Sequence, residues 1–210
     1  MEVLNYKKSV KMRRGFMEQH KTEDFYYEIG ESDILISMPH AVNQTRLGKP
    51  KYAEPGTVSL GLWLAKQLNA SYIVKTQNNF DDANFDESSA YKDKIAQLIA
   101  TKGIKYIIDL HGLKKSRPCD INLGTNFGKN IETDVKLYNE LTKGLQAKGF
   151  VFDTDTPFMA PTRTIAGYFA KEYGIWTIQL EVNSKITNEH AGFIKFNQLV
   201  EVIVDLFKKK

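Results

Sequence analysis

The chain contains few of the residues and segments that mark secreted, membrane or fibrous proteins. Its 210 residues include one cysteine, Cys119, so no disulfide can form within the chain, as is typical of proteins in a reducing compartment. No apolar run approaches the ~18–20 residues that a membrane span needs, and the basic N-terminal residues precede no apolar signal segment. No internal repeat is visible. We therefore expect a cytoplasmic protein without membrane contact.

A net positive charge is absent outside the two ends of the chain. The formal net charge is +4, yet residues 1–21 alone carry +4 and residues 208–210 add +3, so the remaining residues sum to −3. The basic balance thus describes the ends, and we expect no nucleic-acid partner. We interpret residues 1–24 as a polar, basic lead-in of uncertain order and residues 25–210 as a single domain. The sequence does not define the oligomeric state.

Short signatures of several enzyme classes are also absent. No G-x-S-x-G, P-loop or G-x-G-x-x-G occurs, which argues against an elbow-type serine hydrolase and against these nucleotide-binding motifs. H-E-x-x-H and C-x-x-C are absent too, so no closely spaced zinc site is present. Cys119 has no general base beside it in the sequence, and we interpret it as a small buried residue.

What the sequence does contain is an alternation of short apolar runs with longer periodic ones, typical of an α/β domain. The pattern predicts a three-layer fold, in which helices cover both faces of a mostly parallel, mixed sheet. Its strands are expected at residues 33–38, 71–75, 105–110, 120–123, 150–152 and 175–180. Its helices are expected at residues 57–68, with Thr57 as the cap, and at 87–100, 131–148, 165–173 and 189–207.

Three of these apolar strands lead into residues that can bind a metal. His40, His111 and Glu181 follow the strands at 33–38, 105–110 and 175–180. Because the carboxyl ends of parallel strands meet at one edge, we expect the three side chains to lie together. Imidazole and carboxylate ligands suit Zn²⁺. A single histidine in such a place is more often a hydrogen-bonded, partly buried residue, but the matched placement favours a metal site.

Four segments together resemble the N-formylglutamate amidohydrolase family of zinc-dependent amidohydrolases and carboxypeptidases. They are MPHAVNQTRLGKPKYAEPGT (38–57), DLHG (109–112), DINLGT (120–125) and QLEVN (179–183). The resemblance extends from about residue 33 to the last helix. It implies a zinc-carboxypeptidase-like fold and one zinc ion per chain, and it is much less specific for the substrate.

The resemblance also implies a set of zinc ligands. His40 matches the first ligand and His111 the last, whereas Asn43 stands where the usual H-x-x-E has its glutamate. Glu54, in A-E-P-G-T, is then the expected third ligand. Two acids of the loop DDANFD are the alternatives to Glu54: Asp82 and Asp86. Glu54 can also be read as a solvent-facing acid before a helix, where a negative charge is favoured by the helix dipole.

Two further carboxylates have expected roles at the same edge. Glu181 matches the family's catalytic glutamate, which would take a proton from the attacking water and pass it to the leaving nitrogen. A strand-end residue paired with Lys185 is the alternative interpretation of Glu181. Asp109 lies two residues before His111, so it can hold the second imidazole nitrogen. An ordinary hydrogen-bonded carboxylate is equally compatible with Asp109.

A substrate that bears carboxylates needs cationic partners, and arginine suits this because its donors are bidentate. Arg46, Arg117 and Arg163 lie in loops near the expected site, and Asn84 is a weaker polar candidate. We therefore expect a zinc hydrolase that cleaves the amide bond of a small N-acylated amino acid, similar to N-formylglutamate. The alternatives are a zinc carboxypeptidase or amidase that acts on γ-glutamyl or short peptide substrates, and a non-catalytic member of the fold.

Overall fold

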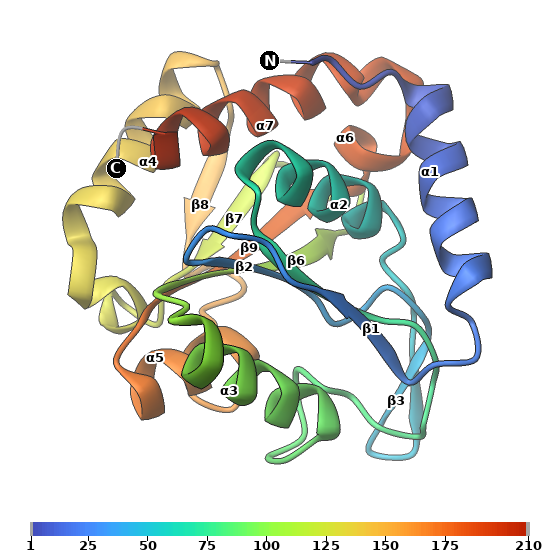
Figure 1. Cartoon of the computed structure of the whole chain (residues 1–210). Helices are drawn as coiled ribbons and strands as arrows, with labels where there is room; N and C mark the ends of the chain where they lie inside the picture. The colour runs from blue at the N-terminus through green and yellow to red at the C-terminus, as the bar shows by residue number, and fades with distance from the viewer. Residues whose placement is uncertain (1, 209–210) are drawn as a thin grey trace.

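The computed structural model describes residues 2–208, and its centre is a seven-stranded mixed β-sheet (Figure 1). The strands lie in the order β1–β5–β2–β6–β9–β7–β8. Strands β5, β2, β6 and β9 are parallel, β1 and β7 are antiparallel to their neighbours β5 and β9, and β8 is parallel to β7. The strand bounds are β1 Phe25–Glu28, β2 Ile34–Met38, β5 Ser71–Lys75, β6 Tyr106–Leu113, β7 Ile121–Gly124, β8 Phe152–Thr154 and β9 Trp176–Asn183.

Helices cover both faces of this sheet, so the expected three-layer α/β fold is confirmed. Figure 1 shows α2, α4 and α7 on one side of the sheet and α3 and α5 on the other. The helix bounds are α1 Tyr6–Gln19, α2 Gly56–Leu68, α3 Ala90–Lys102, α4 Val135–Ala147, α5 Ile165–Tyr173, α6 Ser184–Asn188 and α7 Phe193–Lys208. The remaining elements are the hairpin strands β3 Gln44–Arg46 and β4 Lys49–Lys51 and the 3-10 helices η1 Lys129–Asp134 and η2 His190–Gly192.

The side chains of β2 show how the sequence produces the two layers of core. Ile34, Ile36 and Met38 belong to the hydrophobic cluster under α2 and α7. Leu35 belongs to the cluster under α3 and α5. Successive side chains of a strand point to opposite faces, so a strand that is apolar throughout is buried on both.

Strands β6 and β9 are longer than their apolar runs, which corrects the strands expected at 105–110 and 175–180. The two strands pair in parallel over eight successive residues, and His111 lies opposite Glu181 in this register. Both residues therefore lie inside strands instead of after them. Backbone pairing continues where the apolar pattern stops, because it does not depend on apolar side chains.

Three predicted helices are also corrected at their starts. The helix expected at 87–100 begins at Ala90. In the helix expected at 131–148, the first four residues belong to η1. Helix α4 begins only after Asp134, whose side chain accepts a hydrogen bond of 2.9 Å from the Leu137 N–H. The helix expected at 189–207 begins at Phe193. The strand expected at 150–152 lies two residues later in the sequence, as β8.

The start of α2 differs from the expected cap in a way that affects the site. The helix begins at Gly56, after Pro55, and the N-cap makes no side-chain hydrogen bond. The prediction of Thr57 as the cap is therefore wrong. The Thr57 hydroxyl instead donates to the Glu54 carbonyl at 2.7 Å and so helps to fix the loop before the helix.

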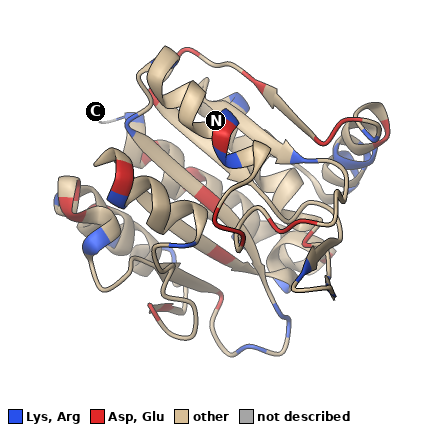
Figure 2. Cartoon of the chain, turned by 90° about the horizontal axis from the view of Figure 1, so that it is seen from below, with Lys and Arg blue, Asp and Glu red and all other residues tan. Residues whose placement is uncertain are grey.

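The N-terminal region contains α1, a helix that the sequence pattern does not predict. Its Lys and Arg residues lie on the helix at one side of the molecule (Figure 2). Leu4, just before it, is fully buried. Its N–H donates to the Asn197 side chain of α7 at 3.0 Å, and that side chain donates to the Leu4 carbonyl at 2.9 Å.

Residues 1, 209 and 210 lie outside the described part, so the expectations for them have no structural counterpart. No helix within residues 2–208 combines the length and the apolar character that crossing a bilayer requires.

Candidate metal centre

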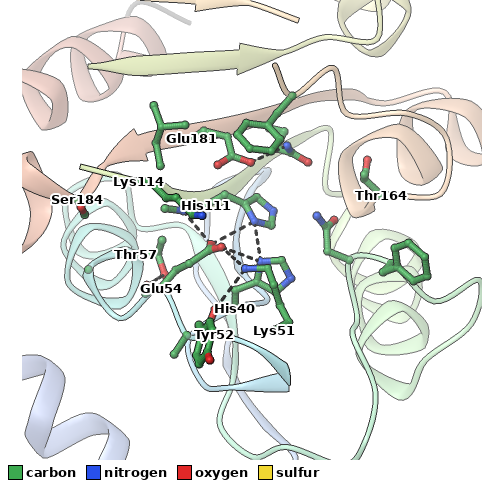
Figure 3. A pocket seen from close by; sticks show the side chains of 18 of the residues that line it. His40, Lys51, Tyr52, Glu54, Thr57, His111, Lys114, Thr164, Glu181 and Ser184 are labelled. Carbon is green, nitrogen blue, oxygen red and sulfur yellow. Dashed lines mark hydrogen bonds and ion pairs between the residues drawn. The ribbon is translucent and has the colours of Figure 1, made fainter. Parts of the chain in front are cut away.

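His40 lies in the turn that follows β2, at the edge where the parallel strands end. Its side chain is buried, and its Nε2 atom lies 2.9 Å from Asp82 Oδ1. The opposite ring nitrogen, Nδ1, faces His111 (Figure 3). The Asp82 carboxylate thus fixes the orientation of the ring, and Nδ1 points into the site.

His111 is arranged in the same way on β6. Its Nε2 atom lies 3.0 Å from Asp109 Oδ2, because residues two apart on a strand share a face. Its Nδ1 atom lies 3.0 Å from His40 Nδ1. Each histidine therefore has a carboxylate behind it and turns the same kind of nitrogen toward the other, a pattern that recurs behind metal-binding histidines.

Glu54 completes this group from the loop before α2. Its Oε1 lies 3.4 Å from His40 Nδ1, and its Oε2 lies 3.5 Å from His111 Nδ1. The Gly112 N–H donates to Oε2 at 2.8 Å. A Cβ atom at Gly112 would lie 2.9 Å from Glu54 Cβ, so only glycine allows this approach. Asn43, at the position of the usual glutamate, accepts a 2.8 Å hydrogen bond from the Ala53 N–H and so holds this loop.

The three side chains fit a divalent metal by the chemistry of their donors. One ligand atom from each of His40, Glu54 and His111 lies within 4.8 Å of the others. When each Nε2 hydrogen is donated to a carboxylate, both Nδ1 atoms are acceptors that face each other and Glu54. Acceptors this close repel one another unless a proton or a metal ion lies among them. Two imidazoles and a carboxylate are also a set found in catalytic zinc sites, which keep one position for water.

A metal at these atoms would compete with protons for them. Burial lowers the pKa of His111, but the Asp109 and Glu54 carboxylates raise it well above its ordinary value. Burial raises the pKa of Glu54, but His40 and His111 hold it well below its usual range. A metal that binds Nδ1 of His111 therefore replaces a proton held by the site.

Glu181 faces this cluster from β9, across from His111 (Figure 3). It is only 6% exposed, and its Oε1 accepts a 3.0 Å hydrogen bond from the Gln179 amide. Burial raises the pKa of Glu181 to about 7, with His111 acting in the opposite direction. A carboxyl group in this state can both accept and release a proton near neutral pH.

Neither alternative to Glu54 belongs to the group formed with the two histidines. Asp82 is on the far nitrogen of His40, and its other oxygen accepts a 2.7 Å hydrogen bond from Arg46. Although burial opposes this, His40 and Arg46 lower the pKa of Asp82. Asp86 accepts a hydrogen bond from the Asp82 N–H at 2.8 Å. The geometry therefore favours Glu54 as the third ligand and gives Asp82 the position of a partner to His40.

The candidate substrate-binding residues all line one cavity of about 780 Å³ that also contains His40, Glu54, His111 and Glu181. Arg163 lies 4.4 Å from the Phe85 ring, and Arg117 lies 5.9 Å from the Phe158 ring. Within residues 2–208, neither arginine has a carboxylate partner. Arg46 is paired with buried Asp82. The Asn84 side-chain oxygen accepts a 2.8 Å hydrogen bond from the Ile165 N–H.

Sequence reasoning missed Gln179, Lys51 and the position of Asp82. Gln179 had a usable signal, since it lies two residues before Glu181 on the same strand and therefore on the same face. Lys51 contacts Glu54 from the hairpin, which no periodic pattern predicts. The roles of all these residues stay predictions.

No protein-family model and no curated protein sequence matches the chain. Solved structures do match it in fold. A gene product of Agrobacterium tumefaciens has a TM-score of 0.71 at 12% identity, over 94% of this chain and 98% of that one. N-formylglutamate amidohydrolase of Ralstonia eutropha has a TM-score of 0.59 at 13% identity, over 89% and 97%. A metallo-carboxypeptidase of Pseudomonas aeruginosa has a TM-score of 0.53 at 12% identity, over 99% and 70%.

The chain thus has the fold shared by N-formylglutamate amidohydrolase and metallo-carboxypeptidases. The fold implied by the resemblance of its four segments is confirmed.

Proposed function

We propose that this protein is a zinc-dependent hydrolase that cleaves the amide bond of a small N-acylated amino acid, similar to N-formylglutamate. We further propose that it works in the cytoplasm, as the single cysteine suggests. The observation that carries the proposal is the convergence of His40, Glu54 and His111, whose ligand atoms lie within 4.8 Å of one another beside buried Glu181.

The residues have separate roles in this reaction. His40, Glu54 and His111 would hold one zinc ion, which supplies Lewis acidity at the amide carbonyl and makes a water molecule more acidic. Glu181 takes the proton of the attacking water and passes it to the leaving nitrogen. Its pKa of about 7 suits both steps near neutral pH. Gln179 donates to Glu181 and orients its carboxylate.

The proposed substrate is a small molecule that carries a carboxylate. Arg117 and Arg163 line the cavity without a carboxylate partner among the described residues, and aromatic rings hold their guanidinium groups. Such groups favour anionic ligands. Arg46 contributes less charge, because Asp82 neutralises it, and Asn84 offers an amide.

A second candidate is a carboxypeptidase or amidase that acts on γ-glutamyl or short peptide substrates. The volume of the cavity, about 780 Å³, favours this candidate, because it lies toward the upper end of the ~300–1,000 Å³ typical of ligand pockets. A panel that compares formylated amino acids with short α- and γ-linked peptides separates the two. Equal inactivity on all of them, with zinc bound, would leave the non-catalytic alternative.

The first experiment is elemental analysis of the untagged protein, of His111→Ala and of His190→Ala, an exposed histidine outside the cavity. We expect about one zinc per chain in the first and third proteins and none in the second. If the unaltered chain takes up no metal after zinc is offered and the excess removed, the proposed function is wrong.

A further inference from the structure

A lysine side chain contacts Glu54, the proposed third ligand of the candidate metal site. Lys51 ends β4, and its ammonium group contacts Glu54 Oε1 (Figure 3). It also donates to the Tyr52 carbonyl at 3.3 Å. Its side chain is one quarter exposed, and that of Glu54 is 14% exposed. The ion pair is therefore shielded from much of the solvent that would weaken it.

The hairpin fixes Lys51 in this place. Lys51 pairs with Gln44 across the two strands. Gln44 is buried, its amide donates to the Pro39 carbonyl, and its oxygen accepts a 3.1 Å hydrogen bond from the Ala83 N–H. Pro39 directly precedes His40 and Ala83 directly follows Asp82, so the hairpin that carries Lys51 is bonded to the frame of the site.

Glu54 does not depend on Lys51 for its orientation. The Gly112 N–H holds Oε2, and the Thr57 hydroxyl holds the main-chain carbonyl of the same residue. Removing the ammonium group would therefore leave the carboxylate in place. The main effect of Lys51 on a divalent cation is then repulsion between like charges a few ångströms apart.

We propose that Lys51 competes with the metal for Glu54, so that it weakens metal binding and its ammonium group is displaced into the cavity when the metal binds. This inference rests on the proposed site of His40, Glu54 and His111. Lys51 then sets the affinity of the site for the metal. The ammonium group of Lys51 should also react more readily with a labelling reagent when the metal is bound.

The first test measures zinc affinity by competition with a coloured chelator for the whole protein. Lys51→Gln removes the charge, Lys51→Arg retains it, and Lys49→Gln is the matched control on the same exposed hairpin. We expect Lys51→Gln to bind zinc at least about tenfold more tightly, which corresponds to ~1.4 kcal/mol. We expect the other two variants to stay within about threefold of the unaltered chain. An unchanged or weaker affinity of Lys51→Gln, or an equal gain in Lys51→Arg, overturns the inference.

The second test needs no variant and so does not depend on how a variant folds. Acetic anhydride labels the lysines of the unaltered protein with and without added zinc, and mass spectrometry quantifies each site. Labelling of Lys51 should increase several-fold when zinc is added, while that of Lys49 stays constant. Constant or reduced labelling of Lys51 in zinc-loaded protein overturns the inference alone. A chain that binds no zinc in either experiment overturns the proposed function as well.

Discussion

Glu181 is the residue on which the proposed chemistry depends most directly. Glu181→Gln keeps the size of the side chain but cannot carry a proton, so we expect turnover to fall by about 10²–10⁴-fold. Zinc content should not change, because Glu181 is not among the three grouped ligands. Rates on a substrate identified by the panel, with zinc measured on the same samples, provide the test.

The matched control for this variant is Glu189→Gln, which alters a half-buried glutamate that pairs with Lys115. We expect it to retain its activity. Full activity of Glu181→Gln would show that another group moves the proton.

The carboxylates behind the two histidines should govern metal affinity. Asp82→Asn and Asp109→Asn each replace an acceptor that orients an imidazole ring, so we expect zinc to bind about 10–100-fold more weakly. Asp93→Asn, at an exposed acid of α3, is the control. Chelator competition measures all three, and an effect in Asp93→Asn as large as in the others would contradict the assignment.

The pKa of His111 predicts the direction in which zinc affinity changes with pH. Because its neighbouring carboxylates raise this pKa, His111 holds a proton in the metal-free site that the metal must displace. Affinity should therefore rise with pH and level off above the raised pKa. Calorimetric titration in two buffers of different ionisation enthalpy should reveal proton release. Affinity that falls as pH rises from 6 to 8 contradicts this account.

At the scale of single residues, the sequence predicts the polar side chains that follow a strongly apolar run and little else. His40, His111 and Glu181 are recognisable because each follows an apolar run that the sequence predicts as a parallel strand. Glu54 lies in a loop without periodicity and is reached only through the family resemblance. The position of Asp82 behind His40 depends on contact across 42 residues, which no local pattern contains.

At the scale of elements, β6 places Gly112 against Glu54, the proposed third ligand, and Gly15 of α1 is the control position. Gly112→Ala places a methyl group 2.9 Å from Glu54 Cβ, so we expect zinc affinity to fall at least about tenfold. Gly15, within α1, has nothing within 4 Å of its would-be Cβ. Gly15→Ala should raise stability by about 0.5–1 kcal/mol and leave zinc binding unchanged. Denaturant unfolding measures the stability of the two variants, and chelator competition measures their zinc affinity. Unchanged zinc affinity of Gly112→Ala would contradict the close approach of Gly112 to Glu54.

The elements that the sequence does not predict share a physical cause. Helix α1 packs on the core through partly buried residues such as Met12 and Phe16, and its one buried residue is Ser9, so its apolar stripe is too weak to identify a helix. The short strands β1, β3 and β4 have three or four residues each, and none of them has a buried apolar residue, so they show no alternating apolar face. Strands β2 and β5 are buried almost throughout and are predicted nearly to the residue.

At the scale of the whole molecule, the metal should stabilise the fold, because its ligands come from three separate segments. Zinc at 100 times its dissociation constant should add about 2.7 kcal/mol to the free energy of unfolding. We expect the melting temperature to rise with zinc and to fall with a chelator in the unaltered chain and in His190→Ala. His111→Ala should show no such response; a shift as large in that variant would indicate zinc binding elsewhere.

The pairing of Leu4 with Asn197 has a consequence for synthesis. The two residues exchange hydrogen bonds across 193 positions of the chain. A ribosome delivers Leu4 well before its partner in α7, which lies 193 residues later in the chain. The central parallel strands can assemble before that point, but the hydrogen bonds between Leu4 and Asn197 form only after α7 has been made. A nascent chain that is halted before residue 197 therefore presents Leu4 and the apolar face beneath α7 to chaperones.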